Sequence, residues 1–381
     1  MSRSLHLTQQ YLFLSLAIII PVSSALTNIN LLLILLIWMF QGDISSKLKS
    51  TFSYKWISSI YILITLYIIG VFVGGYYDCF IWFIKRLWVL LLFPVFFTIN
   101  LEKTTLKKSV VLFLLTNAVS AILAFFISQD LALSAFLLYN HHNILLSFCY
   151  ALSLYILYEK KSNKPILICC LILIYSINIF MQGGRAGYML FVFISMFYIF
   201  YYNRKRIINL LGLLISLAFF LITMFNASSV FQERIYQTKS AFFNNDGGLK
   251  NAKSINNTRY FFVKESFKRI IKKPLIGHGT GSFKSILEQE MMPQSDTTHH
   301  FTPHNNYLFV FFEIGVLGLL VLLSIFYHQI KDLNLMSYSK HRILLPVIFL
   351  LLMLVDSYVF IPTVCITYVY LYTIYSKLEV N

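Results

Sequence analysis

The sequence predicts an all-α, polytopic membrane protein. Of its 381 residues 58% are hydrophobic and only 12% are charged, whereas a soluble domain carries about 25% charged residues. The mean hydropathy is +0.72, and apolar runs of helix-spanning length recur along the whole chain. Basic residues gather in every second loop between these runs, a pattern typical of a chain that crosses a bilayer repeatedly.

About twelve apolar segments are predicted to be transmembrane helices, which puts both termini on the same side. The first resembles a signal peptide, with Arg3 ahead of an apolar run. A second run follows directly at Leu31–Phe40, so we expect a retained span. The predicted spans are 9–26, 28–41, 56–74, 79–99, 109–128, 144–158, 166–181, 187–202, 207–225, 307–328, 343–359 and 361–376.

The basic residues predict the orientation of the spans. One set of loops is rich in lysine and arginine, whereas the short loops of the other set contain only Arg185. By the positive-inside rule the basic loops and both termini are cytoplasmic. The net charge of +16 therefore reflects topology, and no nucleic-acid partner is predicted. The first set holds Arg3, Lys47, Lys49, Lys55, Lys103, Lys107, Lys108, Lys160, Lys161, Lys164, Arg204, Lys205, Arg206, Lys331, Lys340, Arg342 and Lys377.

This orientation divides the chain into spans 1–9 (1–225), a large outer loop (226–306) and spans 10–12 (307–381). The eleven basic residues of the loop do not contradict an outer position, since loops longer than about 60 residues escape the rule.

None of the five cysteines lies in this loop. No disulfide framework or cysteine-based zinc site is indicated.

The outer loop is predicted to be helical. We expect an amphipathic helix over Ser228–Phe243, a turn at Asn244–Gly248, and a second helix that Asn257 or Thr258 caps. The second helix runs to Lys273, before Pro274, and suits a membrane surface over anionic groups. Its apolar face is Tyr260, Val263, Phe267, Ile270 and Ile271, and its basic face is Arg259, Lys264, Lys268 and Lys272. A glycine-rich turn with His278 follows over Pro274–Phe283; no strand precedes it, so it is not a nucleotide loop.

His304 is the strongest candidate for chemistry, because it stands where the polar loop re-enters an apolar helix, in Pro303–Leu308. A histidine there meets both an aqueous and a lipid-borne substrate and changes its charge near neutral pH. A structural alternative is a helix-start residue; a zinc site with His299 and His300 is less favoured, because no carboxylate or helix supports it.

The residues after His304 are predicted to shape its helix. Asn305 or Asn306 would be the N-cap. Gly315 and Gly318 would let the helix pack closely on a neighbour. Glu313 is interpreted as a buried structural acid rather than a catalyst.

Ionisable groups within membrane segments are candidates by default, because their burial is costly. Arg185, in Gln182–Gly187, is either a snorkelling arginine or, as we favour, an anion site whose guanidinium binds phosphate bidentately. Lys85 and Arg86 either line a cavity for diphosphate or reach an interface from a re-entrant chain. Asp356 is expected to pair with one of them. Arg259 is a further anion-binding candidate, because it lies near a helix N-terminus.

Three stretches together resemble the O-antigen ligase family. His304-Asn305, nine residues, Gly315, two residues and Gly318 is similar to the signature of that family. Gln182-Gly-Gly-Arg185-Ala-Gly resembles its short arginine-containing loop. Thr258-Arg259 followed by Pro274-Leu-Ile-Gly-His-Gly resembles part of its large periplasmic loop. These matches cover roughly residues 180–320, and the first half of the chain is similar mainly in topology.

The resemblance implies a GT-C-like glycosyltransferase of the bacterial inner membrane that needs no metal or other cofactor and inverts the anomeric centre. The donor would be O-antigen linked to undecaprenyl diphosphate, and the acceptor would be lipid A–core oligosaccharide. Arg185 and Arg259 would bind the diphosphate, and His304 would activate the acceptor hydroxyl at the periplasmic face. Lys85, Arg86, Asn305, Lys264 and His278 are the predicted substrate-binding residues.

Two alternatives remain open from the sequence. The related O-antigen polymerases, which use lipid-linked repeat units, share the hydrophobic architecture and parts of the motif. A transporter of lipid-linked sugars would use the same cations without chemistry, but would need charge along a transmembrane path. A glycosidase is disfavoured, because no paired carboxylates stand in the outer loop.

Overall fold

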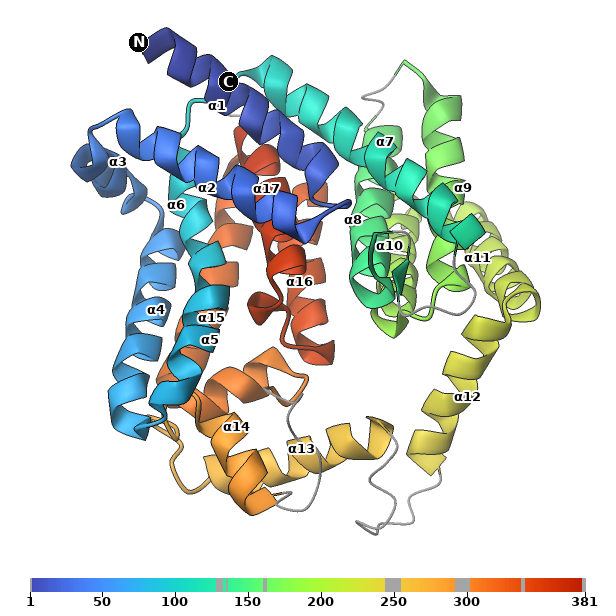
Figure 1. The fold of residues 1–381 in the computed structure, drawn as a ribbon. Coiled ribbons are helices and arrows are strands. Elements are labelled where there is room, and N and C mark those ends of the chain that lie inside the picture. The colour runs from blue at the N-terminus through green and yellow to red at the C-terminus, as the bar shows by residue number, and fades with distance from the viewer. Residues whose placement is uncertain are drawn as a thin grey trace. The chain divides into compact units, whose positions relative to one another are not determined.

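The computed structural model describes residues 2–127, 133–134, 136–159, 163–243, 255–291, 302–336 and 340–378 (Figure 1). These residues are almost entirely helical. The exception is an antiparallel pair of two-residue strands, β1 (Leu133–Ser134) and β2 (Leu137–Leu138), which the sequence analysis did not predict. The predicted all-α architecture is therefore confirmed.

Each predicted apolar segment overlaps a helix or a broken helix. In chain order these are α1 (Ser2–Ile19), α2 (Ser24–Phe40), α4 (Lys55–Gly74), α5 (Phe80–Leu87) with η2 (Trp88–Leu91) and α6 (Leu92–Thr98), α7 (Lys103–Ile127), α8 (Tyr139–Tyr158), α9 (Pro165–Met181), α10 (Arg185–Asn203), α11 (Ile207–Ala227), α15 (Asn306–Met336), α16 (Leu344–Val355) and α17 (Pro362–Lys377). Short elements between them are α3 (Ile44–Thr51), η1 (Tyr77–Cys79), α12 (Ser229–Phe243), α13 (Ile255–Ile270), α14 (Ser282–Ile286), the π-helical turn η4 (Leu287–Met291), η5 (Lys340–Ile343) and η6 (Tyr358–Phe360).

Within the described residues, six helical segments are long and apolar enough to cross a bilayer. A seventh is added if α2 and α3, which meet at 111°, form one bent span. The chain thus has the helices of a multi-pass membrane protein, and the count of twelve spans stays a prediction. The six segments are Lys55–Gly74, Ile81–Thr98, Lys103–Phe126, Arg185–Asn203, Ile207–Ala227 and Asn306–Leu335.

Local chemistry shifts some helix boundaries from the predicted ones. The first helix runs over Ser2–Ile19 instead of 9–26. It ends before Pro21, which has no backbone N–H to continue the hydrogen-bond ladder. α13 begins at Ile255, so Asn257 and Thr258 lie inside its first turn and the predicted cap is wrong.

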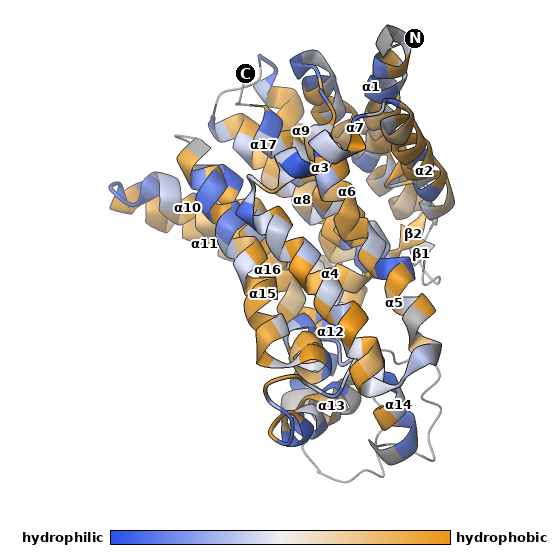
Figure 2. Ribbon diagram, turned by 90° about the vertical axis from the view of Figure 1, so that its left-hand side faces the viewer, coloured by the Kyte–Doolittle hydropathy of each residue, from blue (hydrophilic) through white to orange (hydrophobic). Residues whose placement is uncertain are grey.

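The chain forms two compact units, and each is described by itself. Unit 1 comprises Met1–His6, Leu35–Leu101 and Asp246–Asn381. In it α4 packs along α15, and α13 packs on α15 as well. Figure 2 shows long hydrophobic stretches on α4 and α15, whereas hydrophilic residues appear on α13 and α14. Its aromatic core includes Trp56, whose ring centroid lies 5.0 Å from Phe93 and 5.2 Å from Tyr372.

Unit 2 comprises Leu7–Ile34 and Glu102–Asn245. In it α8 packs against α9 and α10, and α7 packs against α9. Buried amides tie these helices together. Asn178 donates to the carbonyl of Ala121 (2.8 Å), and its Oδ1 lies 3.2 Å from Nε2 of His142. The predicted outer segment is divided between the units, because α12 belongs to unit 2 and α13 to unit 1.

The helix α15 is broken at Gly315, and the glycine-rich turn of unit 1 packs against this break. Its backbone is left-handed (φ 70°, ψ −169°), and an added Cβ would lie 2.1 Å from the carbonyl oxygen of Leu275. The freed backbone groups of α15 bind the turn: Val316 N–H donates to Pro274 (2.9 Å), and the Glu313 carbonyl accepts from Gly279 (2.8 Å). Close packing on a neighbouring helix is therefore not the role of Gly315.

Gly318 also has a role that differs from the predicted one. A Cβ there would lie 2.2 Å from Cγ1 of Ile314 in the same helix. The break at Gly315 turns the Ile314 side chain over the next turn, and Gly318 makes room for it. The interpretation of Glu313 as a buried structural acid is supported, since its Oε1 accepts hydrogen bonds from the amides of Gly281 (3.1 Å) and Phe283 (3.4 Å).

Candidate active site

His304 stands in a tight turn immediately before α15. Its backbone is left-handed (φ 55°), a conformation that non-glycine residues adopt rarely and that asparagine and histidine adopt more readily than most. Of the two predicted N-cap candidates, Asn305 is the one that caps the helix: its Oδ1 accepts from the amide of Leu308 (2.9 Å). Its Nδ2 also donates to the carbonyl of Leu354 (3.1 Å). The turn is therefore fixed to the end of α16.

Asp356, the first residue after α16, faces His304. Its Oδ1 lies 3.1 Å from Nδ1 of His304 and accepts from the amide of Ser357 (2.7 Å). Because an ionised carboxylate only accepts hydrogen bonds, it selects the tautomer with the proton on Nδ1 and the lone pair on Nε2. This is the relation between an orienting acid and a general base.

The pKa of Asp356 lies below its ordinary range. Burial raises this pKa, but the hydrogen bond and the charge of His304, the amide of Ser357 and the charge of Arg259 lower it by more. The carboxylate is therefore ionised at neutral pH. Asp356 was expected to pair with Lys85 or Arg86; that prediction is wrong, because the end of α16 brings it to His304 instead.

Arg259 lies on the buried face of α13, and its charge acts on the carboxylate of Asp356. Phe262, Ser266 and Ile270 share this face and are buried, while Val263, Phe267 and Ile271 are exposed. The prediction that Arg259 shares a face with Lys264 and Lys268 is wrong, since at 3.6 residues per turn they point to the opposite side. The Nε atom of Arg259 is buried without a hydrogen-bond partner among the described residues.

His304, Asp356 and Arg259 are called the histidine cluster below. Phe262 covers its His304 ring, with the centroids 6.4 Å apart and the planes at 22°. The cluster joins a base, the acid that orients it and a cation suited to an anion. The sequence singled out His304 and Arg259 as candidates, but it did not link Asp356 to His304. The one sequence feature that could have identified Asp356 is its position as a lone carboxylate at the end of an apolar run.

The other predicted residues of unit 1 have varied environments. Lys264 is exposed on α13, and Lys85 is exposed on α5. The guanidinium carbon of Arg86 lies 4.1 Å from the ring centroid of Trp82. His278 supports the glycine-rich turn: its Nε2 lies 3.0 Å from the carbonyl oxygen of Arg269, and its ring stacks on Phe312 at 4.9 Å. His299 and His300 lie outside the described residues.

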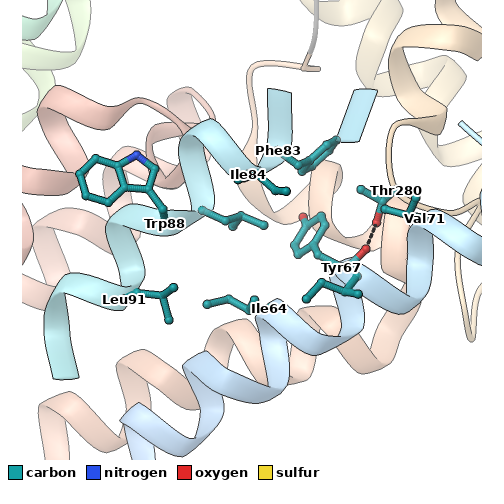
Figure 3. Close-up of a pocket in the computed structure, with 10 residues that line it drawn as sticks. Ile64, Tyr67, Val71, Phe83, Ile84, Trp88, Leu91 and Thr280 are labelled. Atoms are coloured by element: carbon teal, nitrogen blue, oxygen red, sulfur yellow. Dashed lines mark hydrogen bonds between the residues drawn. The ribbon is translucent and has the colours of Figure 1, made fainter. Parts of the chain in front are cut away.

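An apolar groove in unit 1 runs between α4 and α5 (Figure 3). Thr280 closes one end, where its hydroxyl donates to the carbonyl of Tyr67 (2.6 Å). Lys85 and Arg86 are not among its lining residues, although Ile84 and Leu87 are. The groove therefore suits a hydrocarbon chain, and none of its lining residues is a charged residue that could bind a diphosphate. Its lining is Ile64, Tyr67, Ile68, Val71, Phe83, Ile84, Leu87, Trp88, Leu91 and Thr280.

Arg185 lies in unit 2, as the first residue of α10. One of its Nη atoms donates to Oε1 of Gln237 on α12 (3.0 Å). The same oxygen accepts a hydrogen bond from Arg234 (3.0 Å). These three residues are called the arginine cluster below. Arg234 was not singled out from the sequence, because it was one of eleven basic residues in the outer segment.

The glycines before and after Arg185 have separate steric roles. A Cβ on Gly183 would lie 3.0 Å from Nε and Nη2 of Arg234. A Cβ on Gly184 or Gly187 would lie 2.7 Å or 2.8 Å from atoms of Asn143. Asn143 is buried and donates to the carbonyl of Ile179 (3.0 Å). The loop therefore wraps around Asn143 on one side and leaves room for Arg234 on the other.

Comparison with known proteins agrees with the resemblance. A family model described as O-antigen ligase matches residues 169–323, a range that includes Arg185, Arg259 and His304. A curated protein of Rickettsia conorii, named "Putative polysaccharide ligase", is 34% identical over 71 residues, which are 17% of this chain and 17% of that protein. The expected resemblance is thus confirmed over residues 169–323.

Proposed function

We propose that this multi-pass membrane protein, whose residues 169–323 match the O-antigen ligase family, transfers a glycan from undecaprenyl diphosphate to lipid A–core oligosaccharide. The observation that carries the proposal is the contact between His304 Nδ1 and Asp356 Oδ1 (3.1 Å), with the charge of Arg259 acting on the same carboxylate. This arrangement suits a base that takes a proton from a hydroxyl beside a bound anion.

In the proposed reaction His304 Nε2 accepts the proton of the acceptor hydroxyl, while the acceptor oxygen attacks the anomeric carbon of the donor. The bond from that carbon to the diphosphate oxygen breaks, and the leaving group takes the electron pair. Asp356 stabilises the imidazolium that forms. Arg185 and Arg259 are proposed to stabilise the diphosphate, a task in which one lost contact typically costs about 10²–10³ in rate.

A direct displacement inverts the anomeric centre, and the diphosphate already activates the donor. The arginines are proposed to neutralise the leaving group, so we expect transfer to survive EDTA. Loss of transfer that Mg²⁺ or Mn²⁺ restores would argue that a metal shares this task.

The reaction is proposed to take place at the periplasmic face of the inner membrane, with both termini in the cytoplasm. The alternation of basic loops supports this orientation. A cysteine introduced at Ser295, which lies outside the described residues, should react with an impermeant thiol reagent in cells with a permeable outer membrane. Labelling only after lysis would reverse the orientation.

The decisive experiment reconstitutes the purified protein in vesicles with undecaprenyl diphosphate-linked glycan and lipid A–core. A ligase forms a new glycosidic bond to lipid A–core. A polymerase instead lengthens the lipid-linked glycan when repeat units are the only substrate, and a transporter forms no bond in either case. Glycan transfer to lipid A–core that depends on His304 supports the proposal, whereas either other outcome overturns it.

A further inference from the structure

We propose that Arg234 and Arg185 together bind the donor diphosphate, whose oxygens displace Oε1 of Gln237 from between the two guanidinium groups. The inference rests on the proposed function for the identity of the anion. It adds two residues, Arg234 and Gln237, to which the family signature gives no role.

The start of α12 is fixed firmly, and this determines where Arg234 points. The hydroxyl of Ser228 donates to the carbonyl of Phe180 (2.8 Å) and accepts from the amide of Phe231 (3.1 Å). The ring of Phe231 lies 4.8 Å from that of Phe180 and 4.8 Å from that of Tyr188. Arg234 and Gln237 follow at intervals of three residues, so they continue the face of α12 that packs on α9 and α10.

Both guanidinium groups donate to one oxygen, Oε1 of Gln237, at 3.0 Å each. A guanidinium has only donors, so the amide must present its oxygen to them. Glu233 holds it in that orientation, because Gln237 Nε2 donates to Glu233 Oε1 (2.7 Å). An oxyanion in place of the amide oxygen would bind both guanidinium groups more strongly, because hydrogen bonds to ionised acceptors are about twice as strong.

Arg234 is held in place for such an anion. Its guanidinium lies against the backbone of Gly183, where a Cβ would stand 3.0 Å from two of its nitrogens. The ring of Tyr139 lies on another side, 5.6 Å from the guanidinium carbon. A group confined in this way loses little entropy when it binds, which favours affinity.

The backbone at Arg185 adds a second attraction for an anion. Arg185 is the first residue of a 19-residue helix, and the macrodipole of such a helix places partial positive charge at its N-terminus. Two guanidinium forks and a helix N-terminus match the several oxygens of a diphosphate better than the single oxygen of an amide.

The experiment measures binding of undecaprenyl diphosphate to the purified full-length protein in detergent. Undecaprenol, which lacks the phosphates, and inorganic pyrophosphate, which lacks the lipid, are the comparison probes. We expect Arg234→Gln to weaken undecaprenyl diphosphate binding about 10- to 100-fold and to leave undecaprenol binding unchanged. Pyrophosphate should displace undecaprenyl diphosphate from the wild-type protein and should no longer displace it from Arg234→Gln.

Lys239→Gln is the matched control, because Lys239 is an exposed cation on the same helix. It should change affinity by less than about twofold, since an exposed charge contributes little. Arg234→Lys keeps the charge without the fork and should be intermediate. Wild-type affinity in Arg234→Gln, or equal losses in Arg234→Gln and Lys239→Gln, would overturn the proposal.

Gln237 separates an anion site from a purely structural contact. Gln237→Glu places a carboxylate between the two arginines, where it competes with diphosphate, so we expect weaker binding and a more stable fold. Gln237→Ala should bind at least as tightly as wild type. If Gln237 only positions the arginines, the order of affinities is reversed, and the proposed displacement is wrong.

Transfer assays distinguish failure of this inference from failure of the proposed function. Arg234-dependent binding without any glycan transfer by wild type would refute the function and support the diphosphate site. His304-dependent transfer that is normal in Arg234→Gln would support the function and refute the role of Arg234.

Discussion

The histidine cluster of unit 1 and the arginine cluster of unit 2 differ in how their charged groups are paired. In the histidine cluster a carboxylate compensates the nearby cation and orients the imidazole of His304. In the arginine cluster two guanidinium groups share a neutral amide oxygen. The first arrangement suits proton transfer, and the second suits binding of an anion. The comparison supports the proposal that His304 and Asp356 carry out the proton chemistry, whereas Arg185 and Arg234, like Arg259, bind the leaving group.

The largest expected effect comes from His304. His304→Ala should lower glycan transfer about 10²–10⁴-fold without preventing insertion or donor binding. His304→Asn is the sharper variant, because asparagine tolerates the left-handed backbone at φ 55° and still forms hydrogen bonds. It cannot take the proton at neutral pH, so it should be as impaired as alanine. Near-normal transfer by His304→Asn, measured in membranes at matched expression, would leave His304 only a positioning role.

Asp356 should come next. Asp356→Asn removes the charge that selects the tautomer of His304, and we expect transfer to fall on the order of 10²-fold, the lower end of the range for general-base catalysis. The Michaelis constant for donor should change little, because the loss concerns proton transfer. Steady-state kinetics with varied donor separates the two parameters. A raised Michaelis constant with unchanged turnover would place Asp356 in donor binding and erase the contrast between the clusters.

Arg185 is expected to show the opposite kinetic pattern. Arg185→Lys keeps the charge and loses the bidentate fork, so donor affinity should fall about tenfold. His304→Asn should leave that affinity intact. Direct titration of both variants with undecaprenyl diphosphate tests the division of tasks. Equal affinity of Arg185→Lys and wild type would favour the interfacial, snorkelling interpretation of Arg185.

The smallest effect concerns pH and stability. Because the pKa of Asp356 is lowered in the folded protein, its ionised form stabilises the fold. This contribution is complete above the unfolded value of about 3.9 and is lost as the pH falls through the lower folded value. The difference in thermal stability between wild type and Asp356→Asn should therefore shrink as the pH falls below about 4. A difference that stays the same, or grows, as the pH falls below about 4 would contradict the direction of this shift.

The sequence by itself determined the helical, membrane-embedded character of the chain and most of its helices. Apolar runs and basic loops are local signals, because each depends only on transfer of neighbouring residues between water and hydrocarbon. The turn at Pro274–Phe283 and the N-cap at Asn305 were also predictable, since glycine conformation and capping are local properties.

Only the tertiary structure decided which residues meet. Asp356 lies far along the chain from His304, and no periodicity links them; the end of α16 and the turn before α15 bring them together. Arg234 was indistinguishable by composition from its basic neighbours until the packing of Phe231 turned it towards Arg185. The spacing of Gly315 could be recognised in the sequence, but the need for glycine there arises from a long-range contact. A carbonyl of the glycine-rich turn occupies the space that a side chain at this position would fill. Contacts of this kind depend on how distant segments pack, and a local pattern carries no information about that packing.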